Sequence, residues 1–350
     1  MLFKNADVYT RGRIRRLDVA VGPDGVITDM APALEGPGMD CTGLLFLPPL
    51  ADLHTHGWLG IDFTRAGRED LDRMTGWYRK RGVGRFLPTI ISSPREAYPA
   101  IRQRLAGLPL RLEGPFFGPE KKGAHAESCL MPPDRGLLEA LGTDGLAMVD
   151  VDPTRPGALE LIEWLEGQGV RTSIAHTTAT YQQAMAAFDR GCRHVTHLFN
   201  AMNGLHHRES GVLGAAFDRH DVTVELICDG FHISPPVLRM AFALYGGRIC
   251  VISDSHCTMG MGAGDVARLP DGTIAGAVQG VGETIFRLER WGIPLTAAVQ
   301  AAVETPCRVM GWQAPVIAPG APAEFTAFDR RKNNVPAWIC AGGRLEYMEV

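Results

Sequence analysis

The stretch "VTVELICDGFHISPPVLRMAFALYGGRICVISDS", residues 222–255, contains the clearest strand and helix pattern of the chain. Residues 222–230 predict a strand, residues 235–247 predict a helix, and residues 248–255 predict a second strand. A strand followed by a helix and a further strand is typical of a parallel pair in one sheet. The segment therefore predicts an α/β protein with a parallel sheet.

The same alternation fills the middle of the chain. Helical spacing over residues 68–82 is followed by a β run over residues 85–91. Helices are also predicted over residues 156–170 and 179–191, and each is followed by an apolar strand. So many strand and helix units within about 260 residues favour a closed (β/α)8 TIM barrel over an open sheet.

The two ends of the chain have a different pattern. Residues 1–45 contain short alternating runs, with the hairpin-type turn "GPDG" at residues 22–25, and the last stretch of the chain looks similar. We therefore predict a small β-sandwich domain built from both termini, residues 1–47 and 312–350. The (β/α)8 barrel is predicted over residues 48–311.

The composition excludes several classes of protein. The chain has 350 residues, of which 45% are hydrophobic, and a net charge of −4, so it has a full core but no basic run for nucleic acid or an anionic membrane. No apolar stretch approaches the roughly 20 residues of a membrane span, and the N-terminus turns polar too soon for a signal peptide. The eight cysteines form no CxxC pair, which predicts reduced thiols in the cytoplasm.

Polar side chains gather at the carboxyl ends of the predicted strands. Because these ends converge on one mouth of a barrel, where active sites lie, we expect the side chains to share a cavity. In "LADLHTHGWLG", residues 50–60, two histidines stand two positions apart, so both imidazoles face the same side of a strand. The residues at the strand ends are His54, His56, Glu113, His176, His197 and Asp254.

Four histidines and two carboxylates at one rim indicate a metal-dependent hydrolase. Imidazole nitrogen and carboxylate oxygen together suit zinc or another borderline divalent ion, which lowers the pKa of a bound water to about 7. Asp254 could take the proton of that water and pass it to a leaving group. The reaction would be hydrolysis of an amide, an ester or a cyclic amide, or a deamination. Each histidine alone is more often an ordinary polar residue, so the prediction depends on all six residues sharing one rim.

Six stretches of the sequence resemble the N-acetylglucosamine-6-phosphate deacetylase family, within the amidohydrolase superfamily. They are "PPLADLHTHGWLGIDF", "LEGPFFGPEKKGAH", "AHTTATYQQAMAAFDRG", "HVTHLFNAMNGLHHRESGVLGAAF", "DGFHI" and "ISDS". The resemblance implies that the chain hydrolyses the N-acetyl group of N-acetylglucosamine 6-phosphate to give glucosamine 6-phosphate and acetate, in amino-sugar catabolism.

The resemblance also implies roles for single residues. Asp254 would be the general acid and base, and His125 would polarise the acetyl carbonyl. Arg208 would bind the phosphate from the neighbouring subunit of a homodimer, with His232 as a second phosphate contact. The implied metal ligands are Glu113, His176 and His197, with His54 and His56 able to hold a second ion. The implied lining of the sugar pocket is Ala124, Asn200, Ala201, Ile274, Ala275 and Gly276.

Several alternatives stay open at this point. The metal is expected to be Zn²⁺, one or two ions per subunit, with Fe²⁺, Co²⁺ or Mn²⁺ as alternatives. The substrate could instead be N-acetylgalactosamine 6-phosphate or another N-acyl amino sugar, because "SDSHCTMGMG", residues 253–262, departs from the family pattern. A non-catalytic sugar-phosphate sensor is the alternative from a different class.

Four further polar residues have weaker expectations. His256 is either a residue of the cavity or a loop histidine that faces solvent. Asp52 is expected to orient one of the histidines, or the backbone. His194 and His220 are expected to be polar surface or capping residues.

Overall fold

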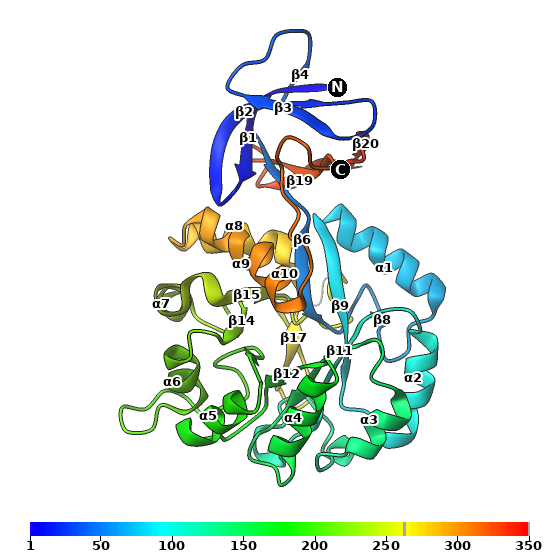
Figure 1. Ribbon diagram of the computed structural model, residues 1–350, viewed down its shortest axis with the longest axis vertical. Coiled ribbons are helices and arrows are strands. Elements are labelled where there is room, and N and C mark those ends of the chain that lie inside the picture. The colour runs from blue at the N-terminus through cyan, green and yellow to red at the C-terminus, as the bar shows by residue number, and fades with distance from the viewer. Residues whose placement is uncertain (262–263, 349–350) are drawn as a thin grey trace. The chain divides into compact units, whose positions relative to one another are not determined.

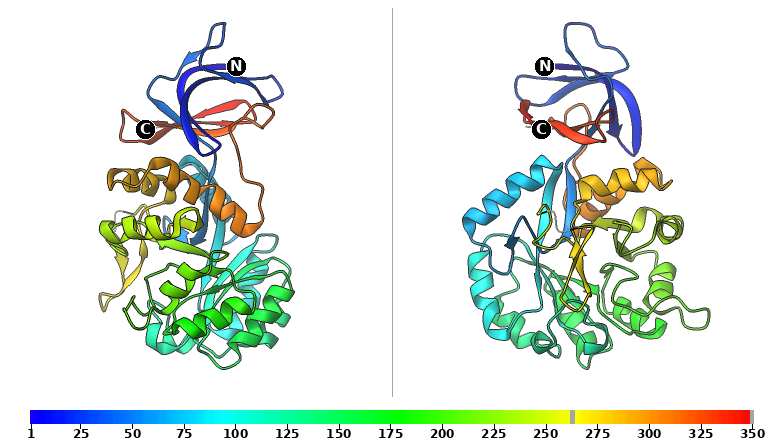
Figure 2. Two further views of the ribbon diagram at one scale, coloured as in Figure 1. Left: turned by 60° about the vertical axis from the view of Figure 1, so that its left-hand side comes forward. Right: turned by 180° about the vertical axis from the view of Figure 1, so that it is seen from behind.

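The structure of the chain is a computed structural model that describes residues 1–261 and 264–348. Its residues form two compact units, which are drawn in Figures 1 and 2. One unit contains Met1–Ala51, Thr75–Arg85 and Val281–Val350, and the other contains Asp52–Met74 and Phe86–Gly280. The domain limits given above, 1–47 with 312–350 and 48–311, stay a prediction.

Eight strands make the parallel sheet that carries the predicted strand ends (Figure 1). Their order in the sheet follows the sequence from β6 and β9 to β15. Their apolar runs are buried almost throughout, as expected for a parallel sheet with helices outside it. The strands are β6 (Leu50–Thr55), β9 (Val83–Ile91), β10 (Leu110–Phe116), β11 (Leu146–Val151), β12 (Arg171–Ile174), β13 (His194–Val195), β14 (Thr223–Ile227) and β15 (Ile249–Ile252).

The first and last strands of this sheet meet at their carboxyl ends. Thr55 on β6 pairs with Ser255, which follows β15. The N–H of Asp254 donates to the carbonyl of His54 at 2.9 Å, and the N–H of His56 donates to the carbonyl of Ser255 at 3.0 Å. These bonds close the barrel, so the predicted (β/α)8 fold is confirmed.

Asp52 holds the same seam between β6 and β15. Its carboxylate accepts the backbone N–H of Ser253 at 3.1 Å and the hydroxyl of Ser253 at 2.5 Å. It also accepts the backbone N–H of His54 at 3.3 Å. Asp52 therefore orients the backbone, which is one of the two roles expected for it.

The helices of the barrel lie outside its strands (Figure 2). Local sequence signals explain several of their starts. Pro235 and Pro236 stand in the first turn of α7, and Thr180 and Gln183 form a capping box at the start of α5. The helices are α1 (Arg68–Lys80), α2 (Tyr98–Arg104), α3 (Arg135–Leu141), α4 (Ala158–Gly167), α5 (Tyr181–Asp189), α6 (Gly211–Asp218) and α7 (Pro235–Tyr245).

A second, largely antiparallel sheet joins the two ends of the chain, as predicted. Its core stacks aromatic rings from both ends, with centroids 4.7 Å apart for Phe46 and Phe325 and 5.2 Å apart for Phe3 and Trp338. Helices α8 (Val281–Arg290), α9 (Leu295–Ala302) and α10 (Glu304–Met310) belong to the same compact unit. Its strands are β1 (Leu2–Thr10), β2 (Arg13–Val21), β3 (Ile27–Ala31), β4 (Met39–Asp40), β5 (Leu44–Leu47), β18 (Glu324–Asp329), β19 (Val335–Ala341) and β20 (Arg344–Tyr347).

Two short hairpins follow β6 and β15. Strands β7 (Gly57–Trp58) and β8 (Ile61–Asp62) form the first, and β16 (Val266–Arg268) and β17 (Ile274–Ala277) form the second. The N–H of Ala277 donates to the carbonyl of Asp254 at 2.9 Å, so the second hairpin is fixed to the end of β15.

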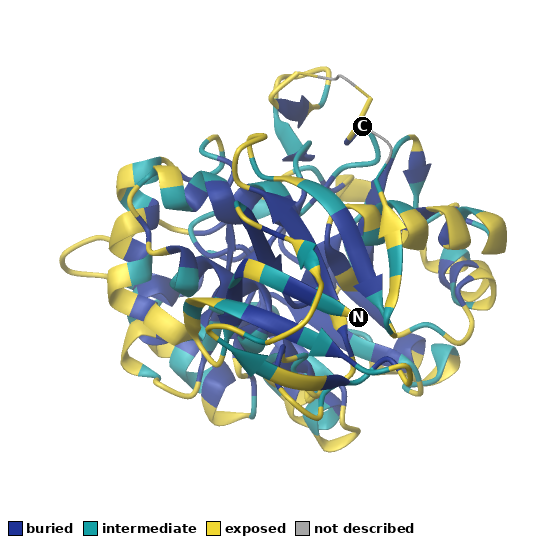
Figure 3. Ribbon diagram, turned by 90° about the horizontal axis from the view of Figure 1, so that it is seen from above, coloured by how far each residue is buried: buried dark blue, intermediate teal, exposed yellow. Residues whose placement is uncertain are grey.

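The burial pattern separates the strands from the helices. In Figure 3 the strands of the barrel are mostly dark blue, whereas the helices change from blue to yellow along their length because one face of each is exposed. Among the described residues, no helix combines the length and the apolar character that crossing a membrane requires.

Candidate metal and substrate site

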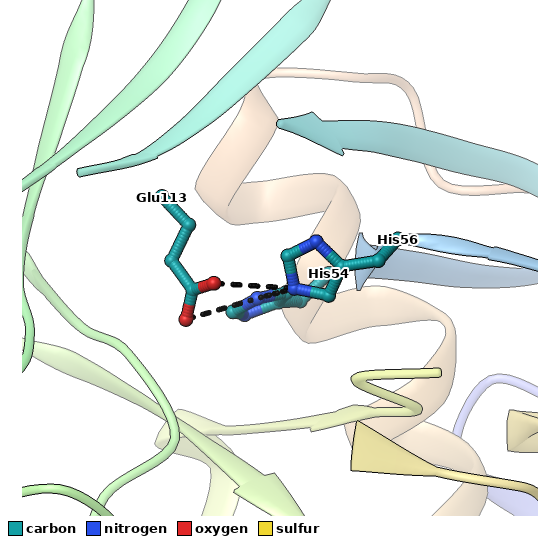
Figure 4. Close-up of side chains that lie close together, drawn as sticks. All are labelled: His54, His56 and Glu113. Carbon is teal, nitrogen blue, oxygen red and sulfur yellow. Dashed lines mark hydrogen bonds and ion pairs between the residues drawn. The ribbon is translucent and has the colours of Figure 1, made fainter. Parts of the chain in front are cut away.

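Glu113 stands at the centre of the predicted cluster. It is the fourth residue of β10 and is 3% exposed. The Nε2 atoms of His176 and His197 lie 3.1 and 3.0 Å from its Oε1. The Nε2 atom of His56 lies 3.2 Å from its Oε2, and that of His54 lies 3.5 Å from its Oε1 (Figure 4). The structure thus brings together all five predicted metal ligands.

Three of these histidines hold their other ring nitrogen, Nδ1, against an oxygen that can only accept a hydrogen bond. The Nδ1 atom must therefore carry the proton, and the Nε2 atom of a neutral ring then carries a lone pair. The oxygens are Oε2 of Glu225 at 3.2 Å from His54, the carbonyl of Thr89 at 3.2 Å from His56, and the carbonyl of Lys121 at 2.7 Å from His176.

This arrangement fits a metal ion. The Nε2 atoms of His54 and His56 are 3.2 Å apart, and those of His176 and His197 are 3.2 Å apart. Nitrogen lone pairs repel one another, and they repel a carboxylate, unless a cation lies between these groups. Imidazole with carboxylate is the donor set of zinc-like ions.

The electrostatics of the cluster also favour positive charge. Burial and the charge of Arg111 lower the pKa of His54, but Asp254 and Glu113 outweigh them and raise it to about 9. Burial lowers the pKa of His56, and hydrogen bonds to Asp254 and Glu113 raise it to about 10. Protons and a metal ion would therefore compete for the same nitrogens, so metal binding should weaken as the pH falls.

Asp254 faces the cluster from the end of β15. Its Oδ1 lies 3.2 Å from Nε2 of His56 and 3.5 Å from Nε2 of His54. Burial raises its pKa, but the charge of His54 and the hydrogen bond from His56 lower it below the usual value. The carboxylate is therefore ionised and can accept a proton.

The backbone is strained at three of the strand ends that form the site. His176, His197 and Asp254 have φ angles of 45°, 30° and 47°, in the left-handed region that non-glycine residues rarely adopt. Such strain persists where the surrounding structure fixes it, and it is concentrated at functional sites.

His125 presents a hydrogen-bond donor to the same space. Its Nδ1 accepts the backbone N–H of Ser92 at 3.3 Å, so the proton of the neutral ring lies on Nε2. That Nε2 is 3.3 Å from Oε2 of Glu113. Burial lowers the pKa of His125 to about 4, which keeps the ring neutral. A neutral N–H aimed into the site can polarise a carbonyl.

A cavity of about 440 Å³ opens next to the cluster. Most residues predicted to bind the substrate line it: Ala124, Asn200, Ala201, His232, Ile274, Ala275 and Gly276. Arg208 is not among the residues that line it; this arginine is exposed, with Nη1 2.8 Å from Nε2 of His207. The structure of the single chain therefore does not bring Arg208 to the site.

His232 is suited to an anion at the edge of this cavity. Its Nδ1 is 2.6 Å from Oδ2 of Asp229, and the backbone N–H groups of Phe231 and His232 both donate to Oδ1 of Asp229 at 2.8 Å. Burial lowers the pKa of His232, but Asp229 outweighs this effect and raises it. A protonated imidazole here can attract a phosphate.

Some residues of the site have no clear signal in the sequence. Asp62, Phe231, Cys257 and Thr273 line the cavity, and so does His256, which is therefore a residue of the cavity, one of the two expectations for it. Gly262, at the end of the segment that departs from the family pattern, lies outside the described residues.

The expectation that His194 is a polar surface or capping residue is wrong. His194 is 2% exposed, and its Nε2 lies 3.0 Å from Oε1 of Glu225 inside the barrel. Because it begins β13 with its side chain on the interior face, it belongs to a buried polar network rather than to the surface. His220, by contrast, is exposed, as expected.

The chain is similar to several known proteins. Residues 45–344 match the amidohydrolase family. The chain is 31% identical to the N-acetylgalactosamine-6-phosphate deacetylase of Escherichia coli O157:H7 over 325 residues, which cover 84% of this chain and 86% of that protein. It is also 31% identical to the N-acetylglucosamine-6-phosphate deacetylase of Bacillus subtilis over 67% of each chain.

A solved structure extends the similarity to nearly the whole chain. It is a mutant of the N-acetyl-D-glucosamine-6-phosphate deacetylase of Mycobacterium smegmatis in complex with N-acetyl-D-glucosamine-6-phosphate. The TM-score is 0.89 and the identity is 29%, over 99% of this chain and 98% of that chain. The chain therefore belongs to the amidohydrolase family, among the N-acetylglucosamine-6-phosphate deacetylases and their relatives.

Proposed function

We propose that this protein hydrolyses the N-acetyl group of N-acetylglucosamine 6-phosphate to give glucosamine 6-phosphate and acetate. The observation that carries the proposal is the convergence of the Nε2 atoms of the four predicted ligand histidines on Glu113, with Asp254 beside them and a sugar-sized cavity at the same strand ends. The relatives named above support the substrate class. The glucosamine epimer is preferred because the structure that matches almost the whole chain is solved with that sugar phosphate.

Two residues of this chain would perform the proton and carbonyl chemistry. The Nε2–H of His125 would donate to the acetyl oxygen and stabilise the charge that develops there. Asp254 would accept the proton of the attacking water and deliver it to the amine as the carbon–nitrogen bond breaks. A divalent metal held at the histidine cluster would supply hydroxide at neutral pH.

Zn²⁺ is the metal we propose, with Fe²⁺, Co²⁺ or Mn²⁺ as alternatives. Two groups of described residues bring their donor atoms close enough to hold an ion, namely His54, His56 and Glu113, and Glu113, His125 and His176. His125 is assigned to the carbonyl and not to a metal, because its Nδ1 accepts a hydrogen bond from Ser92 and its Nε2 carries the proton. Glu113 belongs to both groups, so a carboxylate shared between two ions is compatible with the structure. His197, whose Nε2 is 3.0 Å from Glu113, would complete the main site.

Arg208 would act in a homodimer in the cytoplasm. It stands in the exposed segment of residues 203–209, away from its own chain's cavity lining, and its guanidinium can grip a phosphate with two parallel bonds. Its exposure supports the proposal that it enters the site of a neighbouring subunit. All eight cysteines are free thiols, in keeping with a reducing compartment.

Release of acetate from matched sugars tests the proposed function. With the protein loaded with Zn²⁺, we expect turnover of N-acetylglucosamine 6-phosphate at least tenfold above that of its galactosamine epimer, and far above that of the sugar without phosphate. Faster turnover of the epimer would shift the activity to the alternative substrate. Binding of the sugar phosphate without any release of acetate would indicate a sensor and contradict the proposal.

The variant Arg208→Ala is expected to lower kcat/KM for the phosphorylated sugar by at least tenfold. Hydrogen bonds to charged groups contribute roughly 1.5–3 kcal/mol each, so loss of a two-bond contact has a large effect. Kinetics with the unphosphorylated sugar should change little, and Arg219→Ala, at a partly buried arginine outside the cavity lining whose bonds go to Asp189 and Asp221, serves as the control. An equal loss with both sugars would contradict a role in binding phosphate.

Mixing two variants that are each impaired tests the dimer. If Arg208 crosses to the neighbouring site, a heterodimer of Arg208→Ala and Asp254→Asn chains has one intact composite site, and activity should partly return. If exchange of chains is demonstrated and activity stays absent, Arg208 does not serve the neighbouring subunit.

A further inference from the structure

We propose that Glu225 is a positioning residue that, with Arg111, holds His54 as a metal ligand. Glu225 lies on β14 inside the barrel and is completely buried. Its Oε2 is 3.2 Å from Nδ1 of His54, on the side of the ring opposite to Glu113. The inference rests on the proposed metal site and adds a residue to it.

The carboxylate of Glu225 is fixed by a buried guanidinium. Arg111, which is also completely buried, donates from Nη2 to Oε2 of Glu225 at 3.1 Å and from Nη1 to Oε1. Arg111 is itself held by Asp150, with bonds of 3.0 and 3.2 Å, and by the carbonyl of Leu53 at 3.0 Å. The acceptor beside His54 therefore cannot turn away without breaking a buried ion pair.

The effect on His54 follows from the direction of its hydrogen bond. Because a carboxylate only accepts, Nδ1 of His54 donates and its Nε2 is left with the lone pair that binds metal. The corresponding partners of His56 and His176 are neutral backbone carbonyls. Among the histidines at Glu113, His54 is thus the one whose Nδ1 meets a carboxylate, which raises its strength as a ligand.

The charges around Glu225 also favour a metal ion at His54. One guanidinium, Arg111, faces two carboxylates, Asp150 and Glu225, so these three side chains together carry one formal negative charge. The excess negative charge lies against the ring of His54. It favours a cation on the other side of that ring, at Nε2.

The variant Glu225→Gln separates positioning from folding. It leaves Arg111 paired with Asp150 as a neutral couple, so the variant should fold. The matched control is Asp150→Asn, which removes one negative charge from the same guanidinium with the same acid-to-amide change. Asp150 is buried like Glu225, but its hydrogen bonds go to Arg111 and not to His54.

The affinity of each variant for metal is measured by titrating metal-free protein with Co²⁺. Visible absorbance and metal analysis report the bound ion. For Glu225→Gln we expect the ion bound through His54 and His56 to be held about 10–100-fold more weakly, while the ion at Glu113, His176 and His197 is retained. Asp150→Asn should bind both ions within threefold of the unchanged protein, and thermal unfolding should confirm that both variants fold.

Three outcomes overturn the inference. Equal Co²⁺ binding by Glu225→Gln and the unchanged protein would remove Glu225 from this role. Equal losses in Glu225→Gln and Asp150→Asn would assign the effect to the buried charge network as a whole. Unchanged metal content in His54→Ala would show that His54 binds no ion, and it would also remove the second metal from the proposed function, whereas the first two outcomes leave that function intact.

Discussion

Replacement of Asp254 by Asn is expected to lower turnover by about 10²–10⁴-fold, the usual contribution of a general acid and base. Asn has nearly the same shape, but its amide cannot accept the proton of water or return it to the amine. The carboxylate faces His54 and His56 from the end of β15, and it is ionised in the structure. Steady-state release of acetate measures the loss.

Metal analysis of the same variant separates catalysis from metal binding. The proposed main ligands Glu113, His176 and His197 are untouched, so Asp254→Asn should keep nearly all of its metal. A rate within a few-fold of the unchanged protein, or extensive loss of metal, would remove Asp254 from the role of general acid and base.

Replacement of Glu113 by Ala is expected to strip the metal and abolish activity. Every predicted metal-binding histidine has its Nε2 within 3.5 Å of this carboxylate, so among the described residues Glu113 contacts the most predicted ligands. A catalytic zinc is commonly held by three protein ligands, and the loss of one severely weakens the site. Metal content per chain is the measurement.

The control is a carboxylate that lines the cavity but is held by a residue other than the metal-binding histidines. Asp62 lines the cavity, and its Oδ1 accepts bonds from the N–H and the hydroxyl of Thr64, both at 2.7 Å. Asp62→Ala should therefore keep its metal. Full metal content in purified Glu113→Ala would contradict the assignment of Glu113.

The barrel and the cluster at its mouth could be predicted from the sequence because both depend on local patterns. Apolar runs such as "RICVIS" mark buried strands, and a polar residue directly after such a run must lie at the strand's carboxyl end. The (β/α)8 topology then brings those ends together, which is how Glu113 and Asp254 could be assigned to one cavity. The roles of single substrate-binding residues came from the family resemblance.

The partners that orient the ligands could not be predicted in this way. The acceptors for His56 and His176 are the backbone carbonyls of Thr89 and Lys121, and every residue has a carbonyl. Glu225 lies in an apolar strand, and only the folded sheet shows which of its two faces this side chain is on. The expectation that His194 lies at the surface fails for the same reason.

The role of Arg208 could not be predicted from the strand pattern for a different reason. Its proposed role depends on a neighbouring subunit, so the strand pattern of a single chain does not predict where it acts. The mixing experiment addresses this directly.

The seam between β6 and β15 has a consequence for biosynthesis. Asp52 and Ser253 are 201 residues apart in sequence, yet their hydrogen bonds, with those of the neighbouring backbone, bring His54 and His56 to Asp254. A chain emerging from the ribosome holds the two histidines long before the aspartate has been made. The complete constellation can therefore form only after synthesis has passed residue 255, and the enzyme must acquire its finished metal environment late in translation or after release.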